Sequence, residues 1–283
     1  MPNIESALAE LAGDTCYASI DLCNGYWQMP LEDFSQDCQS FITPDGVFTP
    51  TRVLHGQTNA VPYFQSTISN LCISLRHVIL QWIDDLLFHF RDPRVPLQSL
   101  QSFFLICRQR GLKLHAKKCS FYLTQVTWCG RLISAEGIRF APSQLAALTE
   151  MSPPKNGGEL QQFLCALNWM RATLPEYNKL VAPLSSLLEQ VLRKAGSRTK
   201  RAARKVELTA DYWSPEHAAA FERIKNSLLN AVTLSHPDPN QVLCLFTDAS
   251  DFYWSAVLTQ VPREDRSKPI SQQRHQPLSF LSE

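Results

Sequence analysis

Two adjacent carboxylates, Asp84 and Asp85, lie between apolar runs at 78–83 and 86–88. Apolar runs of this length are typical of buried strands, so the pattern predicts a β-hairpin with both aspartates at its bend. The bend lacks the glycine, asparagine or proline that usually forms such turns. Because neighbouring negative charges repel each other, a bound cation would stabilise the pair, and oxygen ligands suit Mg²⁺. The other interpretation is a charged, solvent-exposed turn, and this stretch alone leaves both open.

A third carboxylate, Asp21, ends an apolar segment at 16–22 that we predict to be a strand. If one sheet contains this strand and the aspartate hairpin, their ends can bring all three carboxylates together. Two metal ions held in such a site can stabilise both the attacking and the leaving oxygen of a phosphoryl transfer. Such an arrangement of three carboxylates would suit a metal-dependent site.

The composition excludes several classes of protein. The net charge of +1 indicates no particular partner, so nucleic-acid binding would depend on local patches. The nine cysteines include no CxxC pair and no zinc-type spacing with histidine, which argues against a disulfide framework and fits a reducing compartment. No apolar run approaches the ~20 residues of a membrane span, and the first residues have no signal-peptide pattern. We therefore expect an intracellular protein that is not secreted and has no membrane partner.

Hydrophobic periodicity predicts the order of the elements. A first helix is capped by Asn3, and the inward face of a helix at 97–110 is formed by Leu97, Leu100, Phe104 and Cys107. Further helices are predicted at 59–75 and 159–173 and from Ser214 onward, the last with Phe221, Ile224, Leu228 and Leu229 as apolar residues. Predicted strands lie at 16–22, 40–43, 47–49, 126–133, 137–140, 242–247, 254–260 and 277–281. The first 140 residues are thus expected to form an α+β fold, with helices on one face of a largely antiparallel sheet.

One segment near the middle of the chain is strongly basic. Its members share a positive charge and are followed by no acid until Glu207: Arg193, Lys194, Arg198, Lys200, Arg201, Arg204 and Lys205. A solvated linker and a phosphate-contacting loop are both consistent with this composition.

Seven ordered segments resemble the reverse transcriptase of gypsy-type LTR retrotransposons. They are 19–31 (SIDLCNGYWQMPL), 56–65 (GQTNAVPYFQ), 82–85 (WIDD), 111–119 (GLKLHAKKC), 129–138 (CGRLISAEGI), 159–168 (ELQQFLCALN) and 246–251 (FTDASD). The resemblance implies a polymerase palm at 1–140 with the fingers absent, and a helical thumb at 141–192. A basic linker and connection helix would follow at 193–235, and the N-terminal part of a ribonuclease H-like α/β domain at 236–283.

The resemblance also implies site residues. Asp21, Asp84 and Asp85 would be the catalytic carboxylates and would hold two Mg²⁺ ions, with Mn²⁺ as a substitute. The residues implied in substrate binding are Tyr26, His55, Gly56, Gln57, Trp82 and Lys118. Cys129 and Gly130 would belong to the primer grip, and Asp248 would be a remnant of the ribonuclease H site.

The implied partners are an RNA or DNA template with its primer and dNTPs, in a cytoplasmic particle or the nucleus. Trp82 replaces the family's tyrosine, His55 replaces its phenylalanine or glutamine, and only Asp248 matches a ribonuclease H carboxylate. We therefore expect impaired or absent polymerase activity and no ribonuclease H activity. The alternative is a catalytically dead remnant that only binds nucleic acid. A palm-type nucleotide cyclase is disfavoured because it would not use the thumb segment.

Overall fold

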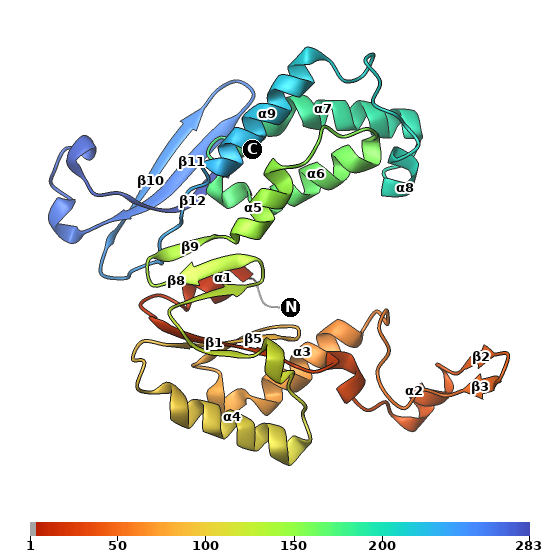
Figure 1. The fold of residues 1–283 in the computed structure, drawn as a ribbon. Coiled ribbons are helices and arrows are strands. Elements are labelled where there is room, and N and C mark those ends of the chain that lie inside the picture. The colour runs from red at the N-terminus through yellow and green to blue at the C-terminus, as the bar shows by residue number, and fades with distance from the viewer. Residues whose placement is uncertain (1–3) are drawn as a thin grey trace. The chain divides into compact units, whose positions relative to one another are not determined.

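The computed structural model describes residues 4–283 and divides into two compact units, Met1–Ala135 and Glu136–Glu283 (Figure 1). The first helix, α1, spans Ile4–Ala9 with Ile4 and Leu8 buried. The predicted cap Asn3 lies outside the described residues. Each unit has its own apolar core, so the two are described separately.

An antiparallel sheet with the strand order β4-β5-β1-β6 forms the centre of the first unit. Its strands are β1 (Cys16–Asp21), β4 (Ile79–Trp82), β5 (Asp85–Phe90) and β6 (Ser120–Leu123). Strands β1 and β5 are almost continuously buried and occupy the two central positions. The predicted strand at 16–22 and the hairpin around the aspartates are confirmed.

Two helices pack on one face of this sheet, α3 (Ala60–Leu71) and α4 (Pro96–Arg110). Alternate strand residues, such as Ile20 and Phe88, share a core with both helices. The predicted inward face of α4 was wrong in part, because Leu97 and Phe104 are 66% and 41% exposed. Phe103 is buried instead, since positions 100, 103 and 107 align on one side of a helix.

A hairpin of β7 (Gln125–Trp128) and β8 (Arg131–Ser134) completes the major elements of the first unit. The single predicted strand at 126–133 was wrong, because the chain reverses at Cys129 and Gly130. Both residues have positive φ, 47° and 74°, as a two-residue type I′ turn requires. A smaller hairpin joins β2 (Phe41–Thr43) to β3 (Gly46–Phe48), as predicted.

Shorter elements connect these parts of the first unit. They are the helix α2 (Asp33–Asp37) and the 3₁₀ turns at Gly25–Gln28, Ile73–Leu75 and Ala116–Lys118. The predicted helix at 59–75 is therefore α3 followed by a 3₁₀ turn, and Phe64 and Ile68 of α3 are buried.

The second unit combines helices with a three-stranded antiparallel sheet of order β10-β11-β12 (Figure 1). Its helices are α5 (Pro142–Thr149), α6 (Gly157–Trp169), α7 (Tyr177–Ala195), α8 (Lys200–Ala203) and α9 (Pro215–Leu229). Its strands are β9 (Gly137–Phe140), β10 (Val242–Ala249), β11 (Trp254–Val261) and β12 (Gln276–Ser282). Among the described residues, no helix combines the length and apolar content needed to cross a membrane.

Two predicted helix boundaries differ from the structure. The helix expected at 159–173 begins at Gly157, where the Asn156 side chain accepts from the Glu159 amide, and a 3₁₀ turn replaces its end. The predicted start of α9 at Ser214 is confirmed by a capping box with His217. Leu229, assigned to the apolar face of α9, is 68% exposed because the helix ends there.

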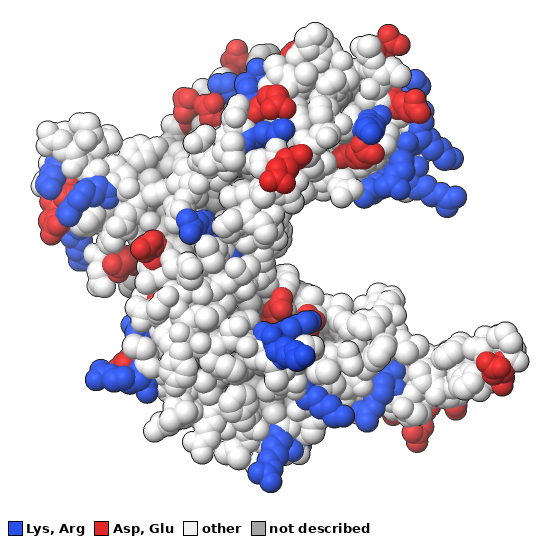
Figure 2. All heavy atoms as spheres, viewed as in Figure 1, with Lys and Arg blue, Asp and Glu red and all other residues white. Residues whose placement is uncertain are grey.

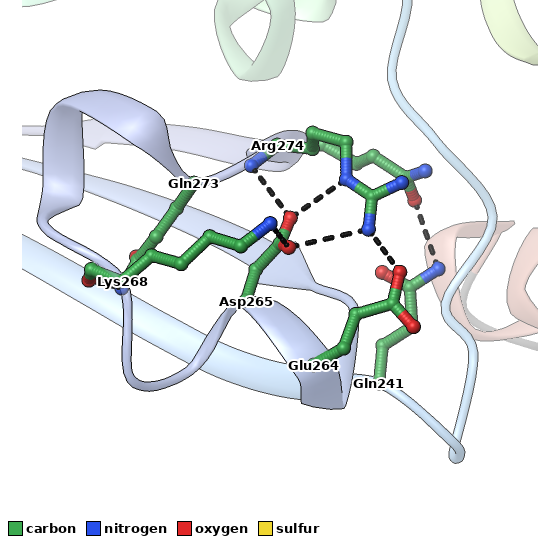
Figure 3. A network of polar contacts seen from close by, with 7 residues as sticks. Gln241, Glu264, Asp265, Lys268, Gln273 and Arg274 are labelled. Atoms are coloured by element: carbon green, nitrogen blue, oxygen red, sulfur yellow. Dashed lines mark hydrogen bonds and ion pairs between the residues drawn. The ribbon is translucent and has the colours of Figure 1, made fainter.

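A buried carboxylate, Asp265, organises the connection between β11 and β12 (Figure 3). Arg274 Nε and Lys268 Nζ donate to its two oxygens at 2.7 Å and 2.6 Å, and Arg274 also pairs with Glu264. The hydrogen bonds from Arg274, followed by that from Lys268, hold the pKa of Asp265 well below its usual range. The ionised carboxylate therefore stabilises the folded state.

Replacing Asp265 with asparagine is expected to lower the melting temperature of the chain by several degrees. A carboxyl whose pKa is depressed by folding contributes fully above its unfolded pKa of about 4 and progressively less below it. The difference between wild type and variant should therefore shrink in thermal melts recorded at decreasing pH below about 4. Asp251→Asn, at an exposed aspartate of the same unit, is the matched control and should melt like wild type.

Candidate active site

Asp21 and Asp85 lie directly opposite each other on the central strands β1 and β5. Opposite residues of an antiparallel pair project from the same face of the sheet. This face is the one opposite the core with α3 and α4, because their neighbours Ile20 and Leu86 point into that core. Trp82 pairs with Asp85 from β4 and extends the same row. Three of the predicted site residues are thus brought together across three strands.

The turn between β4 and β5 consists of Ile83 and Asp84, with Asp85 as the first residue of β5. The prediction that both aspartates form the bend was therefore correct only for Asp84. Ile83 has a φ of 57°, a conformation that a β-branched residue rarely adopts and that carries about 1–2 kcal/mol of strain. Strained backbone of this kind persists only where surrounding contacts determine it.

Two glutamine side chains hold this turn in place. The Ile83 amide donates to Gln65 Oε1 at 2.8 Å, and Gln81 Nε2 donates to the Ile83 carbonyl at 2.9 Å. Gln65 belongs to α3, and its own Nε2 donates to the Gln81 carbonyl at 3.3 Å. The contact between Gln65 and Gln81 could not be predicted, because no periodic pattern marks a polar contact between a helix and a turn.

The charges of the three aspartates act on one another. Asp85 is an exposed residue, yet atoms around its carboxyl raise its pKa by desolvation, and the charges of Asp84 and Asp21 raise it further. Lys118 opposes this shift and contacts Asp21, with 3.3 Å between Nζ and Oδ2. The site therefore concentrates negative charge that one lysine offsets only in part.

Asp85→Asn is expected to raise the melting temperature slightly, on the order of 1 °C, because solvent screens an exposed carboxylate. Folding raises the pKa of Asp85, so its ionised form opposes folding at neutral pH, and protonation near its pKa removes that effect. The gain should appear in thermal melts at pH 7 and disappear as the pH falls through the carboxyl range. A lower melting temperature at pH 7 would contradict mutual repulsion at this site.

An aromatic cluster adjoins the aspartates. The Tyr26 ring lies 5.1 Å from the His55 ring and 5.2 Å from Phe64, centroid to centroid, and Trp27 lies 5.7 Å from His55. Burial raises the pKa of Tyr26, and the Asp84 charge raises it further. The structure thus places Tyr26 near Asp84 and His55 against Tyr26, while the substrate-binding role of both residues stays a prediction.

The predicted primer-grip residues Cys129 and Gly130 form the turn between β7 and β8. Trp128 Nε1 donates to the Asp85 carbonyl at 3.4 Å, which brings this turn to the aspartates. Burial raises the pKa of the Cys129 thiol to about 12, and the charges of Asp85 and Asp84 contribute. The thiol therefore stays protonated and unreactive near neutral pH.

Comparison with known proteins agrees with this arrangement. Residues 1–140 match the family model described as reverse transcriptase (RNA-dependent DNA polymerase). The chain contains a reverse transcriptase domain. Residues 213–274 match a second family model, described as an RNase H-like domain found in reverse transcriptase.

Relatives and solved structures extend the comparison. The chain is 28% identical over 272 residues to the Transposon Tf2-3 polyprotein of Schizosaccharomyces pombe, and 27% identical to the Tf2-7 polyprotein. These alignments cover 95% of the chain but 19% of each relative, so the chain spans about a fifth of their length. A foamy viral protease-reverse transcriptase in complex with RNA/DNA hybrid has a TM-score of 0.81 at 21% identity, covering 99% of this chain and 35% of that one. A second structure of that protein, in complex with dsDNA, has a TM-score of 0.80 at 22% identity and covers 100% and 54% of the two chains. The α+β fold expected from the sequence, a palm followed by a ribonuclease H-like segment, is confirmed.

Two other predicted substrate-binding residues of the reverse transcriptase domain are not in contact with the aspartates. Gln57 donates its amide to Gln39 and lines a hollow of about 380 Å³ together with Tyr63. Gly56 has a φ of 94°, and a Cβ added there would meet no atom within 4 Å. The backbone at Gly56 is therefore open to a close approach by a ligand.

Asp248 lies on β10 in the second unit. It lines a hollow of about 130 Å³ in which Glu176 is the one other carboxylate, beside Asn178, Lys179 and hydroxyl and aromatic residues. The role of Asp248 and the absence of ribonuclease H activity stay predictions.

The donor groups of the reverse transcriptase domain suit a hard divalent cation. Asp21, Asp84 and Asp85 offer carboxylate oxygens, and their repulsion is relieved by positive charge. Among residues 4–283, no three His, Cys, Asp or Glu side chains form a ready-made metal cluster. Mg²⁺ is usually held by one or two carboxylates together with substrate phosphates, so this set fits a site that substrate completes.

Proposed function

We propose that this chain is part of the polyprotein of a gypsy-type LTR retrotransposon and catalyses DNA synthesis on an RNA or DNA template. The observation that carries the proposal is the pairing of Asp21 with Asp85 beside the bend that presents Asp84. Its relatives are transposon polyproteins, and foamy viral structures of similar fold hold dsDNA or RNA/DNA hybrid. The proposed substrates are a primer–template duplex and dNTPs, in a cytoplasmic particle or the nucleus.

Each group near the aspartates has a proposed role. Asp21 and Asp84 would hold two Mg²⁺ ions, which in polymerases stabilise the attacking 3′-hydroxyl and the leaving pyrophosphate. Asp85 shapes the site through its charge, and Lys118 neutralises part of that charge from Asp21. The rigid turn held by Gln65 fixes where the Asp84 carboxylate projects.

The substrate is positioned by the neighbouring groups. Tyr26 would lie beneath the sugar of the incoming nucleotide, with His55 and the open backbone at Gly56 beside it. The turn at Cys129 and Gly130 would hold the primer end against the aspartates, since Trp128 is bonded to the backbone of Asp85.

A primer-extension assay tests the proposal. The purified chain is expected to extend a labelled DNA primer on RNA and on DNA templates when Mg²⁺ or Mn²⁺ is present, at a rate impaired by Trp82 and His55, which replace the family's usual residues. The second candidate is a catalytically dead remnant, favoured by the Lys118 ammonium that already contacts Asp21. Salt-sensitive duplex binding with no extension in either metal would support that candidate and exclude the polymerase.

A further inference from the structure

Seven exposed cationic side chains gather at the end of α7 and around α8. We call them the basic surface: Arg193, Lys194, Arg198, Lys200, Arg201, Arg204 and Lys205. Figure 2 shows the corresponding concentration of Lys and Arg at the α8 end of the helices. The segment lies between the residues matched by the two family models, which cover 1–140 and 213–274.

The basic surface has a folded scaffold. Helix α8 is capped by Thr199, and Ala203 is fully buried. A Cβ added to Gly157 would lie 2.2 Å from Val191 Cγ1 and 2.9 Å from the Ala203 carbonyl, so the glycine allows α8 to approach α6 closely. The segment is therefore not the structureless linker that its composition allowed.

The charges of this surface are mostly not neutralised within the protein. Arg198 pairs with Glu189, Lys194 lies 4.7 Å from the centre of the Tyr212 ring, and Lys200 donates to Gln162 at 2.8 Å. The other four basic side chains have no ion-pair partner among residues 4–283: Arg193, Arg201, Arg204 and Lys205.

Helix energetics alone does not account for this arrangement. Arg193 and Lys194 lie in the last turn of α7, where cations interact favourably with the helix dipole. Lys200 and Arg204 are four residues apart around α8, and like-charge pairs at this spacing destabilise a helix. A bound polyanion would remove that repulsion.

We propose that the basic surface binds the sugar–phosphate backbone of nucleic acid without regard to sequence. The inference rests on the proposed function for its choice of nucleic acid among polyanions. Guanidinium groups, which make up four of the seven cations, bind phosphate oxygens in a bidentate manner. Because each neutralised phosphate releases counterions, the affinity would fall steeply with salt.

Fluorescence anisotropy with a labelled primer–template DNA duplex, over a series of KCl concentrations, tests the proposal. In the full chain, R201Q/R204Q/K205Q is expected to weaken binding at about 0.1 M salt by tenfold or more. The slope of log K against log salt should fall by about 2–3, since each phosphate contact contributes about 0.9. The charge-matched control R139Q/R223Q/R266Q removes three exposed arginines elsewhere in the same unit and should change affinity less than threefold.

The outcomes separate this inference from the proposed function. Equal duplex affinity and equal salt slope for the two triple variants would overturn the basic surface as a nucleic-acid site. The same conclusion would follow if R201Q/R204Q/K205Q lost binding to phosphatidylserine vesicles while its duplex binding stayed unchanged. If the wild-type chain binds duplex but does not extend primers, the proposed polymerase function is contradicted. The comparison of duplex binding by the two triple variants still tests the basic surface in that case. If the triple variant does not fold, R201Q/K205Q should lower the slope by about 1–2, because neither side chain contacts the glycines of α6.

Discussion

Replacing Asp84 with asparagine is expected to reduce the rate of primer extension by about a thousand-fold or more, which corresponds to several kcal/mol of transition-state stabilisation. Asparagine keeps the shape of the side chain but removes the charge that would hold a divalent cation. Asp84 is exposed at the bend, so the substitution should leave folding intact. The loss should appear in single-turnover extension, with duplex affinity nearly unchanged.

The control for this prediction is Asp45→Asn, at an exposed aspartate in the turn between β2 and β3. It removes the same charge from the same unit and should extend primers within about twofold of wild type. Extension that survives in the Asp84 variant would eliminate the assigned metal role. Equal losses in both variants would show that net charge, rather than position, determines the rate.

The central aspartates could be predicted because they depend on local rules. Strand periodicity located β1 and β5, and each strand has an aspartate at one end, Asp21 and Asp85. The two carboxylates come together once both strands belong to the same sheet. The helix at 97–110 was predicted with the same rule, yet its inward residue proved to be Phe103 rather than Phe104. A one-residue error of this kind arises because adjacent apolar residues fit the helical period almost equally well.

The supporting contacts of the site depend on residues distant in sequence. Gln65 lies on α3 and Ile83 follows β4. No local pattern indicates that the Ile83 amide donates a hydrogen bond to the Gln65 side chain. The positive φ of Ile83 contradicts its residue preference, so the sequence argued against this conformation. Exceptions of this type are expected at functional sites, where surrounding contacts determine a strained backbone.

The two glycines at the start of α6 were not predicted to belong to the helix. The helix predicted at 159–173 leaves out Gly157 and Gly158, because glycine interrupts helices in isolation. They begin α6 instead, and a Cβ on Gly158 would lie 3.1 Å from the Lys200 carbonyl. The packing that requires them involves a helix about forty positions later in the chain, which single-sequence periodicity does not detect.

The same reasoning predicts the largest effect on stability, at Gly137 in β9. Gly137→Ala is expected to destabilise the chain by about 3–5 kcal/mol, combining backbone strain with overpacking. Its φ of 144° is unfavourable for any residue with a Cβ, and that atom would lie 2.4 Å from the Leu234 carbonyl oxygen. The same carbonyl accepts from the Ile138 amide at 2.8 Å, so moving it would break the bridge that joins β9 to the segment after α9. Urea unfolding at 25 °C measures the change.

Gly196→Ala separates the two contributions. Gly196 has a φ of 65°, and a Cβ added there would meet no atom within 4 Å, so only the backbone term of about 1 kcal/mol applies. The Gly137 variant should therefore lose several times more stability than the Gly196 variant. Equal losses would show that the backbone around Leu234 can move to accept the added Cβ at little cost in stability. Gly137 would then be required only for its positive φ.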